Sequence, residues 1–129
     1  HGDAILVSGI EAMHGNQLTV YDSRDNSMRL VLTSGLNQGH ALGINDLLNL
    51  GRNQIVVGWR EPDAEKKVGV KIFIPQPGRE TDWKDYWVDD NGMACEDLQL
   101  ADLDGDGRKD IIASGRSTHN LKIYWNRIN

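Results

Sequence analysis

The chain has 129 residues, a formal net charge of −5 and a single cysteine, Cys95. Its length suits one ordinary domain, its acidic balance argues against a nucleic-acid or anionic-membrane surface, and one cysteine excludes an internal disulfide. No apolar run approaches the roughly 18 residues of a membrane span.

Eight short runs rich in Val, Ile, Leu, Tyr and Trp follow one another, bounded by Gly, Asn, Asp or Pro. Such runs predict β-strands, and no stretch of about 12 residues or more keeps a helical period. In chain order the predicted strands are 4–10, 17–22, 28–33, 54–59, 68–74, 85–90, 110–115 and 121–126. The chain is therefore predicted to be all-β.

An internal repeat relates residues 40–60 to residues 96–116, which align without a gap at a distance of 56 positions. Seven of the 21 aligned positions are identical: Leu42/Leu98, Asp46/Asp102, Leu47/Leu103, Gly51/Gly107, Arg52/Arg108, Ile55/Ile111 and Arg60/Arg116. The segments 18–21, 70–73 and 121–124 also match one another as third strands. A unit of four short antiparallel strands repeated at this spacing is typical of a β-propeller blade.

The repeat divides the chain into parts of three blades. We predict strands two to four of one blade in residues 1–39, a full blade in 40–95, and strands one to three of a third blade in 96–129. Propellers close with about four to eight blades. The chain is therefore expected to be a segment of a larger propeller, completed by remaining blades or by another copy of the chain. A stand-alone sandwich of about eight or nine strands is the alternative.

The stretch "ADLDGDGRKD", residues 101–110, gathers four aspartates in a loop between two predicted strands. Hard carboxylate oxygens in a short turning loop suit Ca²⁺, which takes six to eight oxygen ligands at about 2.3–2.6 Å. An EF-hand would require Glu at the twelfth position of the loop, where this chain has Ala113. The loop therefore predicts a calcium site of another type, and an acidic surface turn without metal is the alternative.

The form D-x-D-x-D-G-x-x-D between two strands of a repeated blade resembles the FG-GAP/VCBS family of calcium-binding propeller repeats. The resemblance implies that the loop joins the first and second strands of a blade and holds Ca²⁺ structurally. The ligands that it implies are Asp102, Asp104, Asp106, the Arg108 carbonyl and Asp110.

The preceding unit departs from this pattern. Its equivalent positions are Asp46, Leu48, Leu50 and Gln54, and leucine cannot ligate a metal. We predict no Ca²⁺ there and expect the two leucines to hold the turn closed by apolar packing.

A second set of polar residues recurs at equivalent positions of the repeat. His40 aligns with Glu96 at the start of the first strands, and the candidate ligand-binding residues are His14, Trp59, Arg60 and Arg116. His40, Glu96 and His119 together suit Zn²⁺ or another transition metal, and Glu96 or a histidine could act as a general base. Ordinary hydrogen bonds to neighbouring loops are the alternative for each of them.

Two functions follow from these features. The segments "GHALGIND", "VVGWREP" and "MACEDLQLADLDGDGRKDIIASGRSTHNLKIYWN" look similar to the propeller module of the aldos-2-ulose dehydratases. That resemblance implies a metal-assisted carbohydrate lyase acting on keto-sugars such as 1,5-anhydrofructose at the channel mouth. The first expectation is instead a calcium-binding module for binding or scaffolding in a secreted or periplasmic protein, because Ca²⁺ outside cells would keep the loop filled. Whether the chain is an enzyme stays open between the two.

Overall fold

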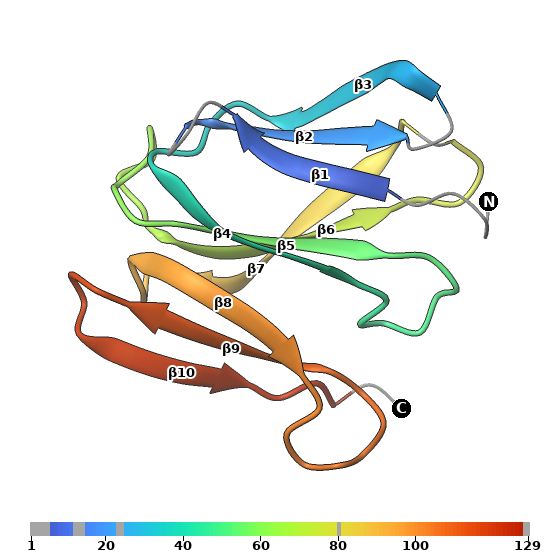
Figure 1. Cartoon of the computed structure of the whole chain (residues 1–129). Coiled ribbons are helices and arrows are strands. Elements are labelled where there is room, and N and C mark those ends of the chain that lie inside the picture. Colours follow the sequence, from blue (N-terminus) through green and yellow to red (C-terminus); the bar gives the residue numbers. More distant parts are fainter. Residues whose placement is uncertain (1–5, 12–14, 23–24, 80, 128–129) are drawn as a thin grey trace.

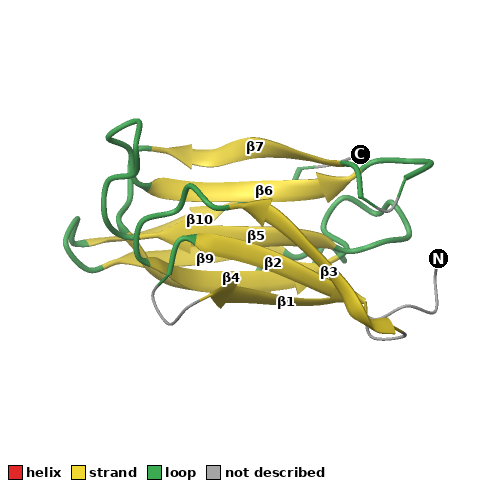
Figure 2. Cartoon of the chain, turned by 90° about the horizontal axis from the view of Figure 1, so that it is seen from above, coloured by secondary structure: helices red, strands yellow, loops and turns green. Residues whose placement is uncertain are grey.

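The computed structural model describes residues 6–11, 15–22, 25–79 and 81–127. In this part of the chain every regular element is a β-strand, and the strands form three antiparallel sheets (Figures 1 and 2). The predicted all-β class is therefore confirmed. Within the same ranges no helix is long and apolar enough to cross a lipid bilayer.

Each sheet is formed by strands that follow one another in the chain. The N-terminal sheet contains β1 (Leu6–Glu11), β2 (Gln17–Asp22) and β3 (Asp25–Thr33). The middle sheet contains β4 (Gly39–Asn45), β5 (Gln54–Trp59), β6 (Gly69–Pro75) and β7 (Trp83–Asp90). The C-terminal sheet contains β8 (Cys95–Ala101), β9 (Asp110–Gly115) and β10 (Asn120–Tyr124).

The three sheets lie in layers, with the middle sheet between the other two (Figure 1). Strand β4 contacts both β1 and β8. The first strands of the middle and C-terminal sheets, β4 and β8, are therefore neighbours. The middle sheet has a buried apolar core on each of its faces.

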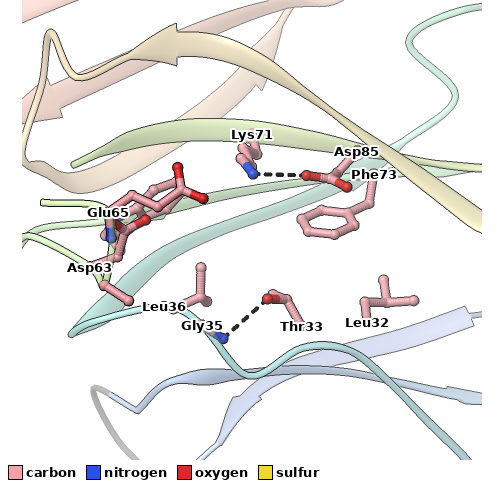
Figure 3. Close-up of a pocket in the computed structure, with 11 residues that line it drawn as sticks. Leu32, Thr33, Gly35, Leu36, Asp63, Glu65, Lys71, Phe73 and Asp85 are labelled. Atoms are coloured by element: carbon pink, nitrogen blue, oxygen red, sulfur yellow. Dashed lines mark hydrogen bonds and ion pairs between the residues drawn. The ribbon is translucent and has the colours of Figure 1, made fainter. Parts of the chain in front are cut away.

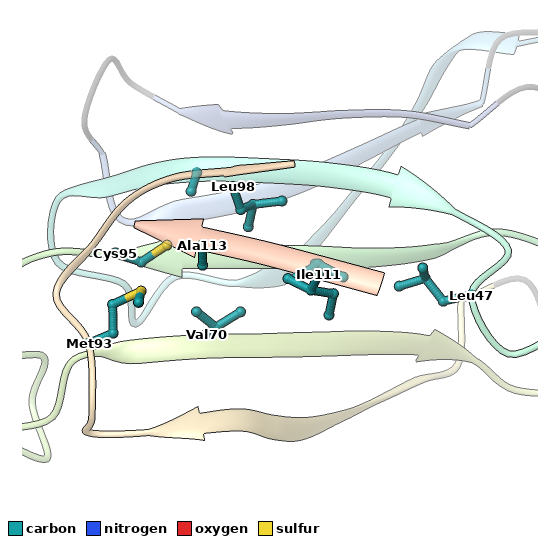
Figure 4. Packing of buried hydrophobic residues seen from close by; sticks show 9 residues of the cluster. Leu47, Val70, Met93, Cys95, Leu98, Ile111 and Ala113 are labelled. Carbon is teal, nitrogen blue, oxygen red and sulfur yellow. The ribbon is translucent and has the colours of Figure 1, made fainter. Parts of the chain in front are cut away.

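Two separate apolar cores join the layers. Between the N-terminal and middle sheets the buried residues are Leu18, Val20, Leu36, Ile55, Val57, Trp59 and Phe73. Between the middle and C-terminal sheets they are Ala41, Leu47, Val56, Val70, Met93, Cys95, Leu98, Ile111 and Ala113 (Figure 4). Strand β5 supplies both cores because successive side chains of a strand point to opposite faces, and it therefore reads as a continuous buried run.

The β4–β5 and β8–β9 ladders have the same register at positions 56 residues apart. Leu42 pairs with Val57 in the first, and Leu98 pairs with Ala113 in the second. Both ladders also have an irregularity after the first residue of the leading strand. The loops after β4 and β8 therefore begin and end at equivalent points of equivalent strand pairs.

Candidate functional site

The loop between β8 and β9 is organised by Asp102. Its Oδ1 accepts the backbone N–H groups of Gly105 at 2.9 Å and Asp106 at 3.2 Å, and its Oδ2 accepts that of Gly107 at 2.8 Å. Gly105 and Gly107 have φ of 75° and 85°, a left-handed conformation that glycine adopts without steric cost. The chain therefore turns tightly around one carboxylate.

The loop between β4 and β5 is held in the same way by Asp46. Its carboxylate accepts the N–H groups of Leu50 at 2.9 Å and Gly51 at 2.8 Å, which are the counterparts of Asp106 and Gly107. Asn49 and Gly51 have φ of 56° and 79°. Partial burial alone would raise the pKa of Asp46, but these hydrogen bonds and one from Gln54 together lower it.

The apolar closure expected of this second loop is not found at Leu50, whereas Leu48 is half-buried. The side chain of Leu50 is 49% exposed, so it contributes little packing. The fully buried amide of Gln54 closes the loop instead: it accepts the N–H of Leu48 at 3.0 Å and donates to the Arg52 carbonyl at 2.7 Å. A polar side chain can satisfy buried backbone groups, which leucine cannot.

Three of the predicted calcium ligands converge. One carboxylate oxygen from each of Asp102, Asp104 and Asp106 lies within 4.8 Å of the other two, and all three residues are exposed. Two arginines balance the negative charge, since Arg127 lies 2.7 Å from Asp104 and Arg108 lies 3.0 Å from Asp106. The hydrogen bond from Arg127 is the main cause that lowers the pKa of Asp104, so Asp104 is ionised at neutral pH.

Asp110 occupies a different environment from the other three aspartates. It is fully buried at the start of β9, where its two oxygens accept the N–H groups of Leu103 at 3.1 Å and Asn126 at 2.9 Å. It is the counterpart of Gln54, and both residues fasten their loop to the sheet. Each oxygen that accepts one N–H retains a second lone pair, so the carboxylate remains a competent oxygen ligand.

Arg108 contributes to the loop through its backbone and its side chain. Its N–H donates to Asp106 Oδ1 at 2.9 Å, and its guanidinium donates to Asp106 Oδ2. These contacts hold the Asp106 carboxylate in place. The four predicted aspartates and Arg108 thus belong to one loop, in which three carboxylates converge and the fourth anchors the end.

The second candidate site brings His40, Arg60 and Glu96 together across the middle and C-terminal sheets. Arg60 donates to both carboxylate oxygens of Glu96, at 3.0 and 3.2 Å, and to the side-chain oxygen of Gln38 at 2.9 Å. His40 Nδ1 donates to the backbone carbonyl of Glu96, and its Nε2 lies 3.8 Å from the Glu96 carboxylate. Burial alone would raise the pKa of Glu96, but Arg60, His40 and Arg116 together lower it.

This cluster links the middle and C-terminal sheets through hydrogen bonds and an ion pair, and we call it the clamp. Because the guanidinium of Arg60 is engaged by Gln38 and Glu96 at once, it fastens β8 to the segment before β4. A low pKa suits Glu96 to ion pairing more than to accepting a proton as a general base.

The remaining candidates form no hydrogen bond with this cluster in the described structure, although the charge of Arg116 contributes to the lowered pKa of Glu96. Trp59 is 1% exposed, packs against Trp87 with ring centroids 5.5 Å apart, and donates its indole N–H to the Lys67 carbonyl. His119 and Arg116 are exposed in the turn before β10, where the His119 N–H donates to the Arg116 carbonyl. His14 lies outside the described residues.

Metal-binding groups can be compared over the same part of the chain. Among the described residues, Asp102, Asp104 and Asp106 form the one group of three or more acidic, histidine or cysteine side chains whose ligand atoms converge. His40, Glu96 and His119 do not form such a group.

A groove that the sequence did not indicate lies between the N-terminal and middle sheets (Figure 3). Its volume is about 210 Å³, and its lining includes Asp63, Glu65 and the ion pair between Lys71 and Asp85, 2.8 Å apart. The full lining also includes residues of β3, the segment after it and β5, so it combines parts of the chain that are distant in sequence and no local motif marks it.

Comparison with known proteins finds no family model, no curated protein and no solved structure that matches this chain. What the chain does must therefore follow from the chemistry of its own residues.

Proposed function

We propose that the chain is a calcium-binding β-propeller segment of the FG-GAP/VCBS type, which serves as a binding or scaffold module of an exported protein. One observation carries the proposal: the carboxylates of Asp102, Asp104 and Asp106 converge within 4.8 Å in an exposed loop. Their chemistry fits Ca²⁺, a hard cation that selects oxygen ligands.

The fit also follows from how the loop is held. Asp102 and Asp110 fix the backbone through N–H groups, so the ion would not have to fold the loop, only to complete it. The loop after β4 has the same backbone hydrogen bonds without the additional acids. The carboxylates of Asp104 and Asp106 are therefore not needed to form the turn, and binding of Ca²⁺ would account for their presence.

The propeller part of the proposal is supported by the order of the sheets. Three antiparallel sheets follow the chain and lie in layers, and the first strands of the middle and C-terminal sheets, β4 and β8, are neighbours. Blades arranged around a channel have this order. The carbohydrate-lyase alternative needs His40, Glu96 and His119 around a common ion, and it lacks such a supporting contact among the described residues.

The test is a thermal melt of the chain with Ca²⁺ and with a chelator. A ligand that binds only the folded state raises Tm, and saturating Ca²⁺ is expected to do so by about 5–10 °C. Replacing Asp104 and Asp106 together by Asn should abolish the shift, because both ligands lose their charge.

Leu50→Ala is the matched control, since Leu50 is the counterpart of Asp106 in the loop after β4. This variant should keep the full calcium shift. A Tm that is the same in Ca²⁺ and in chelator for the unaltered chain would contradict the proposal, as would a shift that survives the double Asn variant.

A further inference from the structure

The groove between the N-terminal and middle sheets (Figure 3) has an apolar floor. Leu36, Trp59 and Phe73 line it from the core that joins the two sheets, and Leu32 packs against that core. All the lining residues lie between positions 32 and 85 of the chain. The groove is therefore formed by two sheets that pack together within the chain, and its floor offers a ligand apolar contact.

One wall of the groove is the loop between β5 and β6, which carries Asp63, Ala64 and Glu65. This loop spans residues 60–68, whereas the matching connection between β9 and β10 spans only residues 116–119. A short turn is therefore enough to join such a pair of strands, and the additional length of the first loop carries both acids. Binding residues are often placed on loops that a rigid scaffold positions.

The loop is fixed to the segment that follows β3. The side-chain amide of Asn37 donates to the Pro62 carbonyl at 2.8 Å, and the Glu61 N–H donates to the Asn37 carbonyl at 3.2 Å. Within the loop, Asp63 Oδ1 accepts the N–H of Glu65 at 2.9 Å. These contacts hold the groove open before a ligand enters, as is usual for small-molecule sites.

The groove has an acidic end. Figure 3 shows Asp63 and Glu65 together at one end and Phe73 toward the other. A third carboxylate, that of Asp85, pairs with Lys71 at 2.8 Å. Among the described residues, no lysine or arginine forms an ion pair with Asp63 or Glu65. Three carboxylates and one lysine give the lining a formal charge of −2, which lies at the end formed by the loop.

The lysines of the loop do not neutralise these acids. Lys66 and Lys67 do not line the groove, and the Lys67 ammonium pairs with Asp90 at 3.0 Å. Asp63 and Glu65 are not among the described residues whose ligand atoms converge as a metal site does, and a metal ion would leave the apolar floor without a contact. The groove therefore complements a cation that carries an apolar part.

We propose that this groove binds a small organic ammonium ion, a free primary amine with an apolar body of about one ring. The ammonium lies at the acidic end, where it donates charge-assisted hydrogen bonds to Asp63 and Glu65, and the apolar body packs toward Phe73. The volume of about 210 Å³ is below the roughly 300–1,000 Å³ of sites for drug-sized ligands, so it holds a whole amine of this size. The groove is separate from the predicted calcium loop, which joins β8 to β9.

Titration of the ¹⁵N-labelled 129-residue chain with phenethylamine, followed by ¹H–¹⁵N NMR, tests the proposal. The amide signals of Gly35, Ala64 and Glu65 should shift together. The Kd should be on the order of 1 mM, because a ligand this small gains little binding free energy in total. Unchanged signals of these three amides at concentrations well above that Kd would overturn the proposal.

Related compounds separate the contributions of the charge and the ring. Phenethyl alcohol keeps the ring without the charge, and methylammonium keeps the charge without the ring; each should bind at least about threefold more weakly than phenethylamine. Nα-acetyl-lysine amide represents the lysine side chain of a partner protein, and it should also bind more weakly. Equal or tighter binding of any of these three compounds would overturn the proposal.

Glu65→Gln removes one negative charge from the acidic end. The printed hydrogen bond of Glu65 is made by its backbone N–H, so the substitution keeps the loop intact, and the Kd for phenethylamine should rise about two- to fivefold. Glu61→Gln is the matched control, because Glu61 is an exposed acid of the same loop that does not line the groove. Its Kd should match that of the unaltered chain. An unchanged Kd in Glu65→Gln, or an equal rise in both variants, would overturn the proposal.

Discussion

The hydroxyl of Thr19 is buried without a hydrogen-bond partner, the only such side-chain atom among the described residues. An unsatisfied buried polar group costs about 1–3 kcal/mol. Thr19→Val keeps the β-branched shape and removes this group, so the free energy of unfolding should rise by about 1 kcal/mol. Urea denaturation measures the change. Thr33→Val is the control: the Thr33 hydroxyl accepts the Gly35 N–H at 3.1 Å, so its removal should not raise the free energy of unfolding.

Single residues also show where sequence patterns mislead. Trp59 and Arg60 are adjacent and were both candidate ligand-binding residues, but successive residues of a strand point to opposite faces. Trp59 therefore lies in the core, whereas Arg60 reaches Glu96. The repeat aligned Gln54 with Asp110, but its role in closing the loop was not predicted, because a buried glutamine looks like any polar residue until the backbone groups around it are known.

At the scale of elements, the spacing between the middle and C-terminal sheets depends on Gly58. A Cβ at this position would lie 2.4 Å from the Cys95 sulfur and 2.6 Å from its Cβ, and both residues are fully buried. Gly58→Ala should therefore lower the free energy of unfolding by about 1–3 kcal/mol through overpacking. Gly35→Ala is the control, because its nearest neighbour would lie at 3.6 Å; equal losses in both variants would argue against close packing as the cause.

The strands themselves were largely predictable. Bounds of 17–22, 54–59 and 110–115 agree with β2, β5 and β9, because each is a run of β-formers between turn residues. Strands β4 and β8 lack such runs and were located only through the 56-residue alignment. The converging aspartates were also predicted, since their spacing is local, whereas the groove beside Lys71 required the sheets to be packed.

At the scale of the whole molecule, Asp89 links two of the three layers. It lies at the end of β7, is 7% exposed, and accepts hydrogen bonds from Tyr124 and Lys122 of β10 and from the Gly92 N–H. Burial alone would raise the pKa of Asp89, but these hydrogen bonds outweigh it and lower the pKa. The folded state therefore favours the ionised carboxylate more than the unfolded chain does.

The pH dependence of stability follows from that direction. A carboxylate with a lowered folded pKa contributes its full stabilisation above its unfolded value of 3.8, and the contribution fades as the pH falls below it. Asp89→Asn should cost about 2 kcal/mol at pH 6, and the gap to the unaltered chain should narrow as the pH falls from about 5 to 3. Urea denaturation across this range measures the gap. The control is Asp90→Asn, at an exposed residue paired with Lys67, which should change the free energy of unfolding by less than about 1 kcal/mol. If the difference between Asp89→Asn and the unaltered chain stays constant with pH, the ionised form of Asp89 does not hold the two sheets together.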